Sequence, residues 1–394
     1  MTAPDDGPSA TASTPSVPAG QSTPFRFYDN RQKYLAFVTT CNEKSVIAAR
    51  CAEELPQLEP TPPALRLFDA GMGDGTVLSR VLRTVHHLFP TVPVLAVAKE
   101  ISLEDVRLGL EKLPDRFVEH PHTVVVVTNL TYADAPALLP SDGARAALLR
   151  WQEVPLDGAS AHELGAQIEA LGPTLAAGWG TSPSPETGNP IPLQPSVLVL
   201  YRRDHEFLLD DVLARLREHA VSYDFVLASQ PWRARMGVAF KVEKILAPLA
   251  RSLAPGGRLL TVQSWGRDPA AEIVERLWPG EMPFTVDRHV LLAALRTELG
   301  EDAADYDLAD PPDEDAVFRY EMHTLPSEIG DRIGTSTLFA AWNAVIYVNQ
   351  IEDERLRETL LEGEYLQVTQ DVLREHGALW FNDEAFVVAR RRGG

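Results

Sequence analysis

The stretch LRLFDAGMGDGTVL, residues 65–78, decides the fold. It begins as a short apolar strand, passes through glycines at alternating positions, and continues into a helix whose apolar side chains form one stripe. Gly71, Gly73 and Gly75 allow a sharp turn and leave no side chain where a ligand would approach the backbone. The helix that follows offers unpaired N–H groups at its first turn. We therefore expect a ligand site at the end of this strand.

The acid before the first glycine separates this loop from a dinucleotide-binding loop. A dinucleotide-binding fold spaces its glycines G-x-G-x-x-G, whereas the spacing here is G-x-G-x-G. Asp69 would repel a pyrophosphate but suits the ammonium end of a cofactor that carries an amino acid. Both the glycine spacing and Asp69 argue against a dehydrogenase on a dinucleotide-binding domain, which we keep only as a second hypothesis.

Strands and helices alternate on both sides of this stretch. Apolar runs predict further strands at 92–100, 122–130, 223–229 and 258–265. Amphipathic segments predict helices at 76–89, 102–113 and 238–253. Continuous apolar strands separated by such helices indicate an α/β fold, in which a doubly wound, mostly parallel sheet has helices on both faces.

Glu100 ends the second of these strands. A carboxylate at this place in a parallel sheet can accept hydrogen bonds from both hydroxyls of a ribose. Alternatively, Glu100 is a solvated strand end and the glycines are only a tight turn. Asp69, the glycines and Glu100 together favour the ligand site.

Composition narrows the partners. The formal net charge of −20 argues against a broad surface for nucleic acid or anionic membrane, although a local basic patch can exist. No apolar run approaches the length of a membrane span, and the N-terminus does not read as a secretory signal. We expect a cytoplasmic protein with Cys41 and Cys51 as free thiols, no metal site, and no nucleic-acid or membrane partner. The oligomeric state stays open.

The chain outside the core is predicted in four parts. Residues 1–24 read as a disordered leader, and residues 25–60 as a helical segment that is either a lid or an ordinary covering helix. Residues 61–394 form one domain with insertions at about 140–200 and 300–376. In the second insertion we expect an exposed acidic loop at 301–315 and a long helical stretch at 336–376.

The segments 65–78, 223–229 and 249–264, with the turn Ala254-Pro255-Gly256-Gly257, resemble the Rossmann-like (class I) S-adenosylmethionine-dependent methyltransferases. The resemblance covers about residues 65–135 and 221–266. It implies a seven-stranded sheet whose last strand is antiparallel, with its sixth and seventh strands near FRYEMH and FVVARR. It also implies S-adenosyl-L-methionine as cofactor.

The resemblance carries over to individual site residues. Those that match positions facing the methionine part and ribose are Asp69, Gly71, Gly73, Gly75 and Glu100. Those that match positions beside the adenine are Asn129 and Leu130, and those beside the transferred methyl group are Ser229 and Gln230. Trp232 is expected on the substrate side.

The acceptor is the least determined feature. The run Ser229-Gln230-Pro231-Trp232 resembles the [D/N/S]-P-P-[F/Y/W] sequence of enzymes that methylate planar amino groups, but Gln replaces the first proline. We favour a methyltransferase for a small-molecule acceptor, in secondary metabolism. An amino-group N-methyltransferase acting on a macromolecule and a non-catalytic S-adenosylmethionine-binding protein remain alternatives. No catalytic base is assigned.

Overall fold

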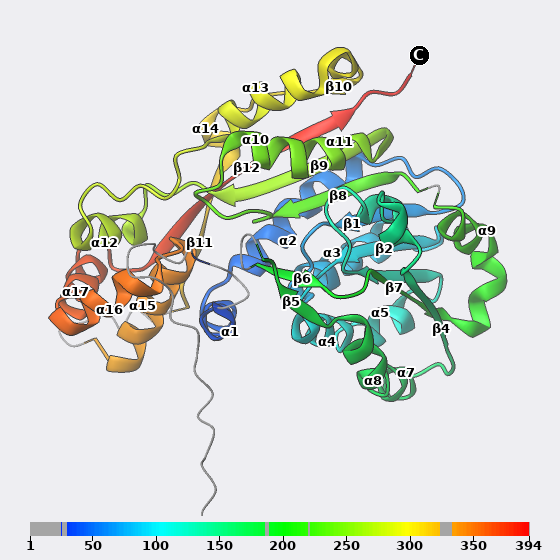
Figure 1. Cartoon of the computed structure of the whole chain (residues 1–394), viewed down its shortest axis with the longest axis horizontal. Coiled ribbons are helices and arrows are strands. Elements are labelled where there is room, and N and C mark those ends of the chain that lie inside the picture. The colour runs from blue at the N-terminus through cyan, green and yellow to red at the C-terminus, as the bar shows by residue number, and fades with distance from the viewer. Residues whose placement is uncertain (1–24, 26–29, 186–188, 220, 324–332, 394) are drawn as a thin grey trace, which may run out of the picture.

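The computed structural model describes residues 25, 30–185, 189–219, 221–323 and 333–393, so the predicted leader at 1–24 lies outside the described residues. The centre of the molecule is a ten-stranded sheet in the order β10-β12-β9-β8-β1-β2-β3-β7-β4, and β11 also pairs with β12 (Figure 1). Its five parallel core strands are β1 (Leu65–Asp69), β2 (Val94–Lys99), β3 (Thr123–Thr128), β8 (Tyr223–Ser229) and β9 (Leu253–Ser264). This arrangement confirms the predicted doubly wound fold.

The antiparallel last strand is also confirmed. The strand β12 (Trp380–Arg390) pairs antiparallel with β9. Its two ends pair with β11 (Val317–Glu321) and β10 (Tyr306–Asp307). The predicted sixth and seventh strands are therefore β11 and β12. The turn predicted at 254–257 lies inside β9, where the register against β8 shifts.

The sheet is wider than the seven strands that the resemblance implies. Two strands from the first insertion, β4 (Arg150–Leu156) and β7 (Ser196–Arg202), extend it beyond β3. Because β7 is an apolar run buried along its whole length, it covers the edge of β3, to which it is antiparallel. A separate hairpin, β5 (Thr181–Pro183) and β6 (Pro190–Pro192), lies in the same insertion.

Helices cover both faces of the sheet. One face carries α2 (Glu43–Glu54), α3 (Thr76–Leu88), α4 (Leu103–Leu110), α5 (Pro114–Glu119), α7 (Ala161–Glu169) and α8 (Gly172–Gly178). The other carries α9 (Glu206–Arg217), α10 (Val238–Lys241), the π-helix η5 (Val242–Leu246), α11 (Ala247–Arg251) and α13 (Arg288–Leu299). Successive strand residues alternate between the two cores: Val97 packs on the second face, and Ala96 and Ala98 on the first.

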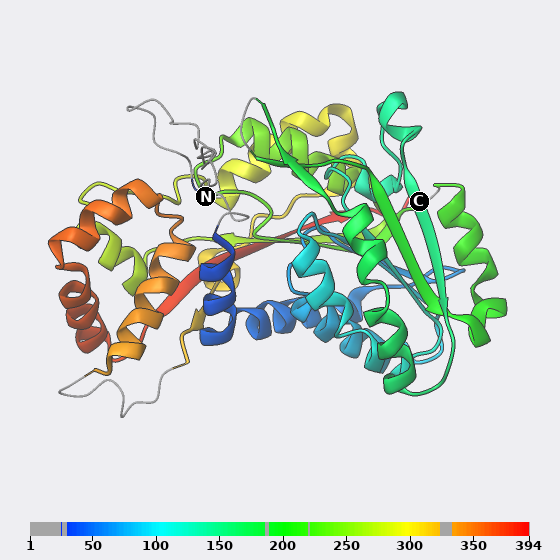
Figure 2. The same ribbon diagram turned by 60° about the horizontal axis from the view of Figure 1, so that its bottom comes forward.

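A third apolar core lies at one end of the sheet. It joins α1 (Arg31–Thr40), α12 (Pro269–Leu277), α15 (Thr335–Val348), α16 (Asp353–Glu362) and α17 (Tyr365–His376) to β11 and β12 (Figures 1 and 2). The single long helical stretch predicted at 336–376 is wrong, because the chain breaks between α15 and α16 and again at Gly363, whose φ is +76°.

The acidic run at 301–315 is not simply an exposed loop. It contains η6 (Gly300–Asp305), β10 and α14 (Asp313–Ala316). The buried Arg288 forms ion pairs with Asp310 and Asp313 of this run and with Glu384 of β12. These ion pairs hold the segment against the sheet. The remaining short elements are η2 (Leu55–Gln57), η3 (Ala135–Ala137), α6 (Gly143–Ala146) and η4 (Arg203–His205).

The described residues contain no helix with the length and apolar character that a membrane span requires. Cys41 and Cys51 are both buried free thiols, as predicted.

Candidate functional site

The site lies where the strand order reverses. From β1 the chain continues to β2 and β3 on one side, and β8 is added on the other side of β1. Ligands of doubly wound sheets bind outside the carboxyl ends of the strands at such a point. A cavity of about 240 Å³ occupies it, lined by Gly71, Gly73, Glu100, Ser229 and Gln230 among others. The structure therefore brings together most of the predicted cofactor residues.

The glycine loop after β1 requires glycine at two positions. Gly73 and Gly75 have φ values of +53° and +75°, which side chains rarely adopt. A Cβ atom on Gly75 would lie 2.5 Å from the Cα of Gly109 on α4, so this glycine allows α3 and α4 to approach. Gly71 and Gly73 line the cavity, whereas Gly75 does not.

Asp69 lies beneath this loop at the end of β1. Its Oδ1 accepts a hydrogen bond from the N–H of Gly71 at 3.1 Å. Burial raises the pKa of its carboxyl to about 6, although the hydrogen bond from Gly71 and the charge of Lys44 oppose that shift. A positive group bound nearby would favour the ionised carboxylate.

Glu100 joins the loops after β1 and β2. Its Oε2 accepts from the N–H of Gly73 at 3.0 Å, and its Oε1 accepts from the N–H groups of Ile101 and Ser102, both at 2.8 Å. Burial raises the pKa of this carboxyl, and the charge of Asp105 adds to the effect. The carboxylate borders the cavity, so it is placed to meet a ligand while it fixes both loops.

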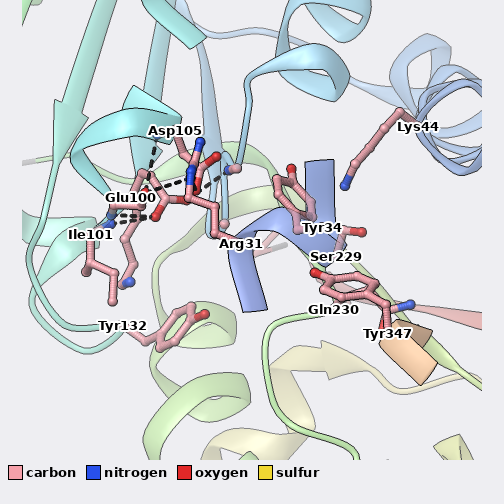
Figure 3. A pocket seen from close by; sticks show the side chains of 14 residues that line it. Arg31, Tyr34, Lys44, Glu100, Ile101, Asp105, Tyr132, Ser229, Gln230 and Tyr347 are labelled. Atoms are coloured by element: carbon pink, nitrogen blue, oxygen red, sulfur yellow. Dashed lines mark hydrogen bonds and ion pairs between the residues drawn. The ribbon is translucent and has the colours of Figure 1, made fainter. Parts of the chain in front are cut away.

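Helix α1 covers the cavity. The hydroxyl of Tyr34 accepts from the N–H of Asp74 at 3.2 Å. Arg31 forms an ion pair with Asp105 at 2.7 Å and donates to the Oγ of Ser102 at 3.0 Å. Figure 3 shows Arg31 near Glu100 on one side of the cavity and Tyr34 toward the other. The segment that was predicted to be a lid or a covering helix therefore lies against the glycine loop.

Sequence reasoning missed several lining residues. Tyr347 of α15 has its ring centroid 5.8 Å from that of Tyr34, and Lys44 has its Nζ 5.5 Å from the Tyr34 centroid. Tyr347 is far from Tyr34 and Lys44 in the sequence, so no local pattern links it to them. Lys99 stands directly before Glu100 and also lines the cavity, together with Tyr132. A charged residue at the end of an apolar strand was the available signal for Lys99.

A second cavity, of about 750 Å³, borders the first. Lys99, Ile101, Tyr132 and Gln230 line both. The predicted adenine residues Asn129 and Leu130, and Trp232 from the predicted substrate side, are on the second cavity and not on the first. The remaining lining residues come from α6, β6, α10, η5 and their neighbouring loops: Thr131, Ala133, Arg145, Asn189, Pro190, Ile191, Pro192, Pro231, Arg233, Met236, Phe240, Lys244 and Ile245.

The side chains of Asn129 and Trp232 already have protein partners. The amide of Asn129 donates to the carbonyls of Gly178 and Gln194 at 3.0 and 2.9 Å, and its Oδ1 accepts from the N–H of Ser196. The Nε1 of Trp232 donates to Gln263 at 2.9 Å, and the ring is 5% exposed. Asn129 therefore shapes the cavity wall, and Trp232 is mostly a core side chain with one edge on the cavity.

The loop after β8 holds its glutamine firmly. Gln230 has a φ of +47°, its Nε2 donates to Asp383 at 3.1 Å, and its Oε1 accepts from the N–H of Ser264 at 3.2 Å. The described residues that line the two cavities include no histidine. Their other titratable groups include Lys99, Glu100 and Tyr132, and none of these is assigned as a general base.

No protein-family model matches the sequence, and no curated protein matches it. Solved methyltransferases are among the structures to which this one is similar. Geranyl diphosphate methyltransferase in complex with GPP and sinefungin is 12% identical, with 87% of this chain and 77% of that chain covered and a TM-score of 0.32. Phosphoethanolamine N-methyltransferase 2 from Haemonchus contortus is 10% identical, with 88% and 53% covered and a TM-score of 0.26. PKMT2 from Rickettsia typhi in complex with AdoHcy is 10% identical, with 86% and 52% covered and a TM-score of 0.29.

This chain spans about half the length of the latter two structures. Because the identities and TM-scores are this low, the ligands and substrates of those proteins are not carried over to this chain. The fold of this chain rests on its own strand order, with a doubly wound parallel core and an antiparallel strand beside β9.

Proposed function

We propose that this chain, which has the fold of the Rossmann-like methyltransferases, is an S-adenosylmethionine-dependent methyltransferase for a small-molecule acceptor. The observation that carries the proposal is the joining of the glycine loop to the acid after β2. The loop reaches the cavity at Gly71 and Gly73, and Gly73 is hydrogen-bonded to the carboxylate of Glu100, which borders the same cavity at the point where the strand order reverses.

The residues in and around the first cavity fit the parts of the cofactor. Asp69 does not line the cavity but lies below the glycine loop, where its negative charge would favour an amino-acid ammonium. Glu100 would accept the ribose hydroxyls. Ile101 and Leu130 offer apolar contacts for the adenine at the boundary of the second cavity. When bound, S-adenosylmethionine supplies an electrophilic methyl group on its sulfonium.

The protein's own contribution to the reaction would be alignment and exclusion of water. Gln230 is held on both sides of its amide, so the loop after β8 presents a fixed surface between the two cavities. Tyr34 and Tyr347 cover the other side of the first cavity. Fixed alignment of an acceptor with an electrophile can supply much of the rate without a catalytic base. We propose on this basis that α1, within the segment predicted at 25–60, acts as a lid.

We favour a small-molecule acceptor over an amino group of a macromolecule because Trp232, which would stack on such an amino group, is buried in the protein core. A ring that is 5% exposed, with its Nε1 bonded to Gln263, lacks a free face on which to stack a flipped-out planar amine. The cytoplasmic location and the assignment to secondary metabolism stay predictions from the sequence.

The proposal is tested by thermal unfolding with S-adenosylhomocysteine, sinefungin, NAD or NADP. A ligand that binds only the native state raises the melting temperature by mass action. We expect the two adenosyl amino acids to raise it and the dinucleotides to leave it unchanged. Stabilisation by a dinucleotide alone would contradict the proposal. Transfer of labelled methyl groups to small-molecule pools would then separate an enzyme from a protein that only binds the cofactor.

A further inference from the structure

The second cavity concentrates positive charge in a strongly acidic protein. The chain has a formal net charge of −20, yet four cations, Lys99, Arg145, Arg233 and Lys244, line this one cavity. Its described lining residues include no Asp or Glu. The negative net charge of the protein repels anions at long range. The cluster of cations in this cavity therefore points to a local role for positive charge there.

Lys99 is the most buried of the four cations. It is only 9% exposed, and its Nζ lies 4.4 Å from the ring centroid of Tyr132. Within the described part of the chain, this Nζ has no hydrogen bond or ion pair. Burial lowers the pKa of Lys99, and the charge of the neighbouring Glu100 opposes that shift without reversing it. Glu100 borders the first cavity and not the second, so a ligand anion would supply a counter-charge on the side of the second cavity.

The rest of the wall is apolar. Leu130, Trp232, Met236 and Ile245 line the cavity, and Phe240 of α10 lines it while 45% exposed. Such a wall suits a hydrocarbon or aromatic body. The adenine, by the proposed function, takes the corner beside Ile101 and Leu130. The space toward α10 and the β5–β6 hairpin remains for another molecule, and Gln230 connects it to the first cavity.

We propose that this second cavity binds the methyl acceptor, and that the acceptor is a small amphipathic anion. Its apolar body would lie against Met236 and Phe240, and its carboxylate or phosphate group would pair with the cations, of which Lys99 is the most buried. Charge-assisted hydrogen bonds to such a group gain strength because the site is shielded from water. This inference rests on the proposed function, which places the methyl donor in the first cavity.

The test is a calorimetric titration of the full chain, with and without S-adenosylhomocysteine, using probes of one chain length. Octyl phosphate and octanoate carry the anion, 1-octanol is the neutral match, octyltrimethylammonium is the cationic match, and inorganic phosphate lacks the apolar body. We expect octyl phosphate and octanoate to bind at least about tenfold more tightly than the three controls, which corresponds to about 1.4 kcal/mol. Comparing the two anions shows whether phosphate or carboxylate is preferred.

Variants locate the binding. Lys244→Ala, Arg145→Ala and Lys99→Met should each weaken octyl phosphate several-fold, whereas Arg357→Ala, which removes an exposed charge on α16, should not. Binding of 1-octanol or octyltrimethylammonium as tight as that of octyl phosphate would overturn the proposal, and so would equal losses in all four variants. Failure of S-adenosylhomocysteine to bind, while octyl phosphate still binds through these residues, would instead count against the proposed function.

Discussion

The carboxylate of Glu100 accepts a hydrogen bond from the backbone N–H of Gly73 at 3.0 Å, so the acid after β2 is tied to the glycine loop after β1. The same carboxylate accepts from two further N–H groups, those of Ile101 and Ser102. The two loops that would hold the cofactor are therefore one hydrogen-bonded unit, and a change in Glu100 affects both.

Glu100→Ala should weaken S-adenosylhomocysteine at least about tenfold, because charge-assisted hydrogen bonds to the ribose are worth about 1.5–3 kcal/mol. The variant should also lose about 1–3 kcal/mol of unfolding free energy, since three N–H groups lose their acceptor. Calorimetry and urea unfolding measure the two effects. Glu111→Ala, which removes an exposed acid just after α4, is the control and should change neither. Wild-type affinity in a folded Glu100→Ala protein would remove Glu100 from the site.

Asp69 predicts a pH dependence. Burial raises the pKa of its carboxyl from the ordinary value of 3.8 to about 6. Its contribution to stability is therefore complete below about pH 4 and is lost as the pH rises through 6. A bound ammonium favours the ionised form, so S-adenosylhomocysteine should bind more tightly as the pH rises from 5 to 7. In Asp69→Asn the affinity should be lower and this rise should disappear. Parallel pH profiles for the two proteins would show that Asp69 does not face the ligand.

The lid is tested through Arg31, which holds α1 to Asp105 and Ser102. If α1 must open for the cofactor, Arg31→Ala should speed the dissociation of S-adenosylhomocysteine several-fold in stopped-flow measurements. An ordinary covering helix predicts no such change. Arg80→Ala, on an exposed position of α3, is a control for the loss of one surface charge. Hydrogen exchange of α1 should also slow when the ligand is bound.

Trp232 is predicted to act mainly as a core residue. Trp232→Ala should cost about 3–5 kcal/mol of unfolding free energy, because it removes a large buried ring. Trp232→Phe keeps most of the volume and removes the hydrogen bond to Gln263, so it should cost about 1–3 kcal/mol. Chemical denaturation measures both. An alanine variant with wild-type stability would contradict the packing and return Trp232 to a direct role with the acceptor.

The parts of the fold that could be predicted are those with local signals. The core strands, the glycine loop and Glu100 each follow from a short pattern of apolar residues, glycines and one acid. The added strands β4 and β7 could not be placed, because the apolar run of β7 does not by itself reveal that it pairs with the open edge of β3, far away in the sequence. The break of the long C-terminal helix at Gly363 was overlooked, although a glycine was the visible signal.

The site was predictable to a similar extent. The side of the first cavity next to the sheet is formed by residues near strand ends, which a sequence pattern can locate. Its cover comes from side chains far apart in the chain, such as Tyr34 and Tyr347, whose rings meet only after folding. Lys99 was missed because an apolar strand with one terminal lysine usually means a solvated end, whereas this lysine is buried between two cavities.

The central claim is that the cavity at the ends of β1, β2 and β8 holds S-adenosylmethionine. Isothermal titration calorimetry of the full chain with S-adenosylhomocysteine tests it most directly. The account predicts one molecule bound per chain, with the heat abolished by preincubation with sinefungin and strongly reduced in Glu100→Ala. Absence of binding to a folded protein, or binding that Glu100→Ala and Asp69→Asn both leave unchanged, would contradict it.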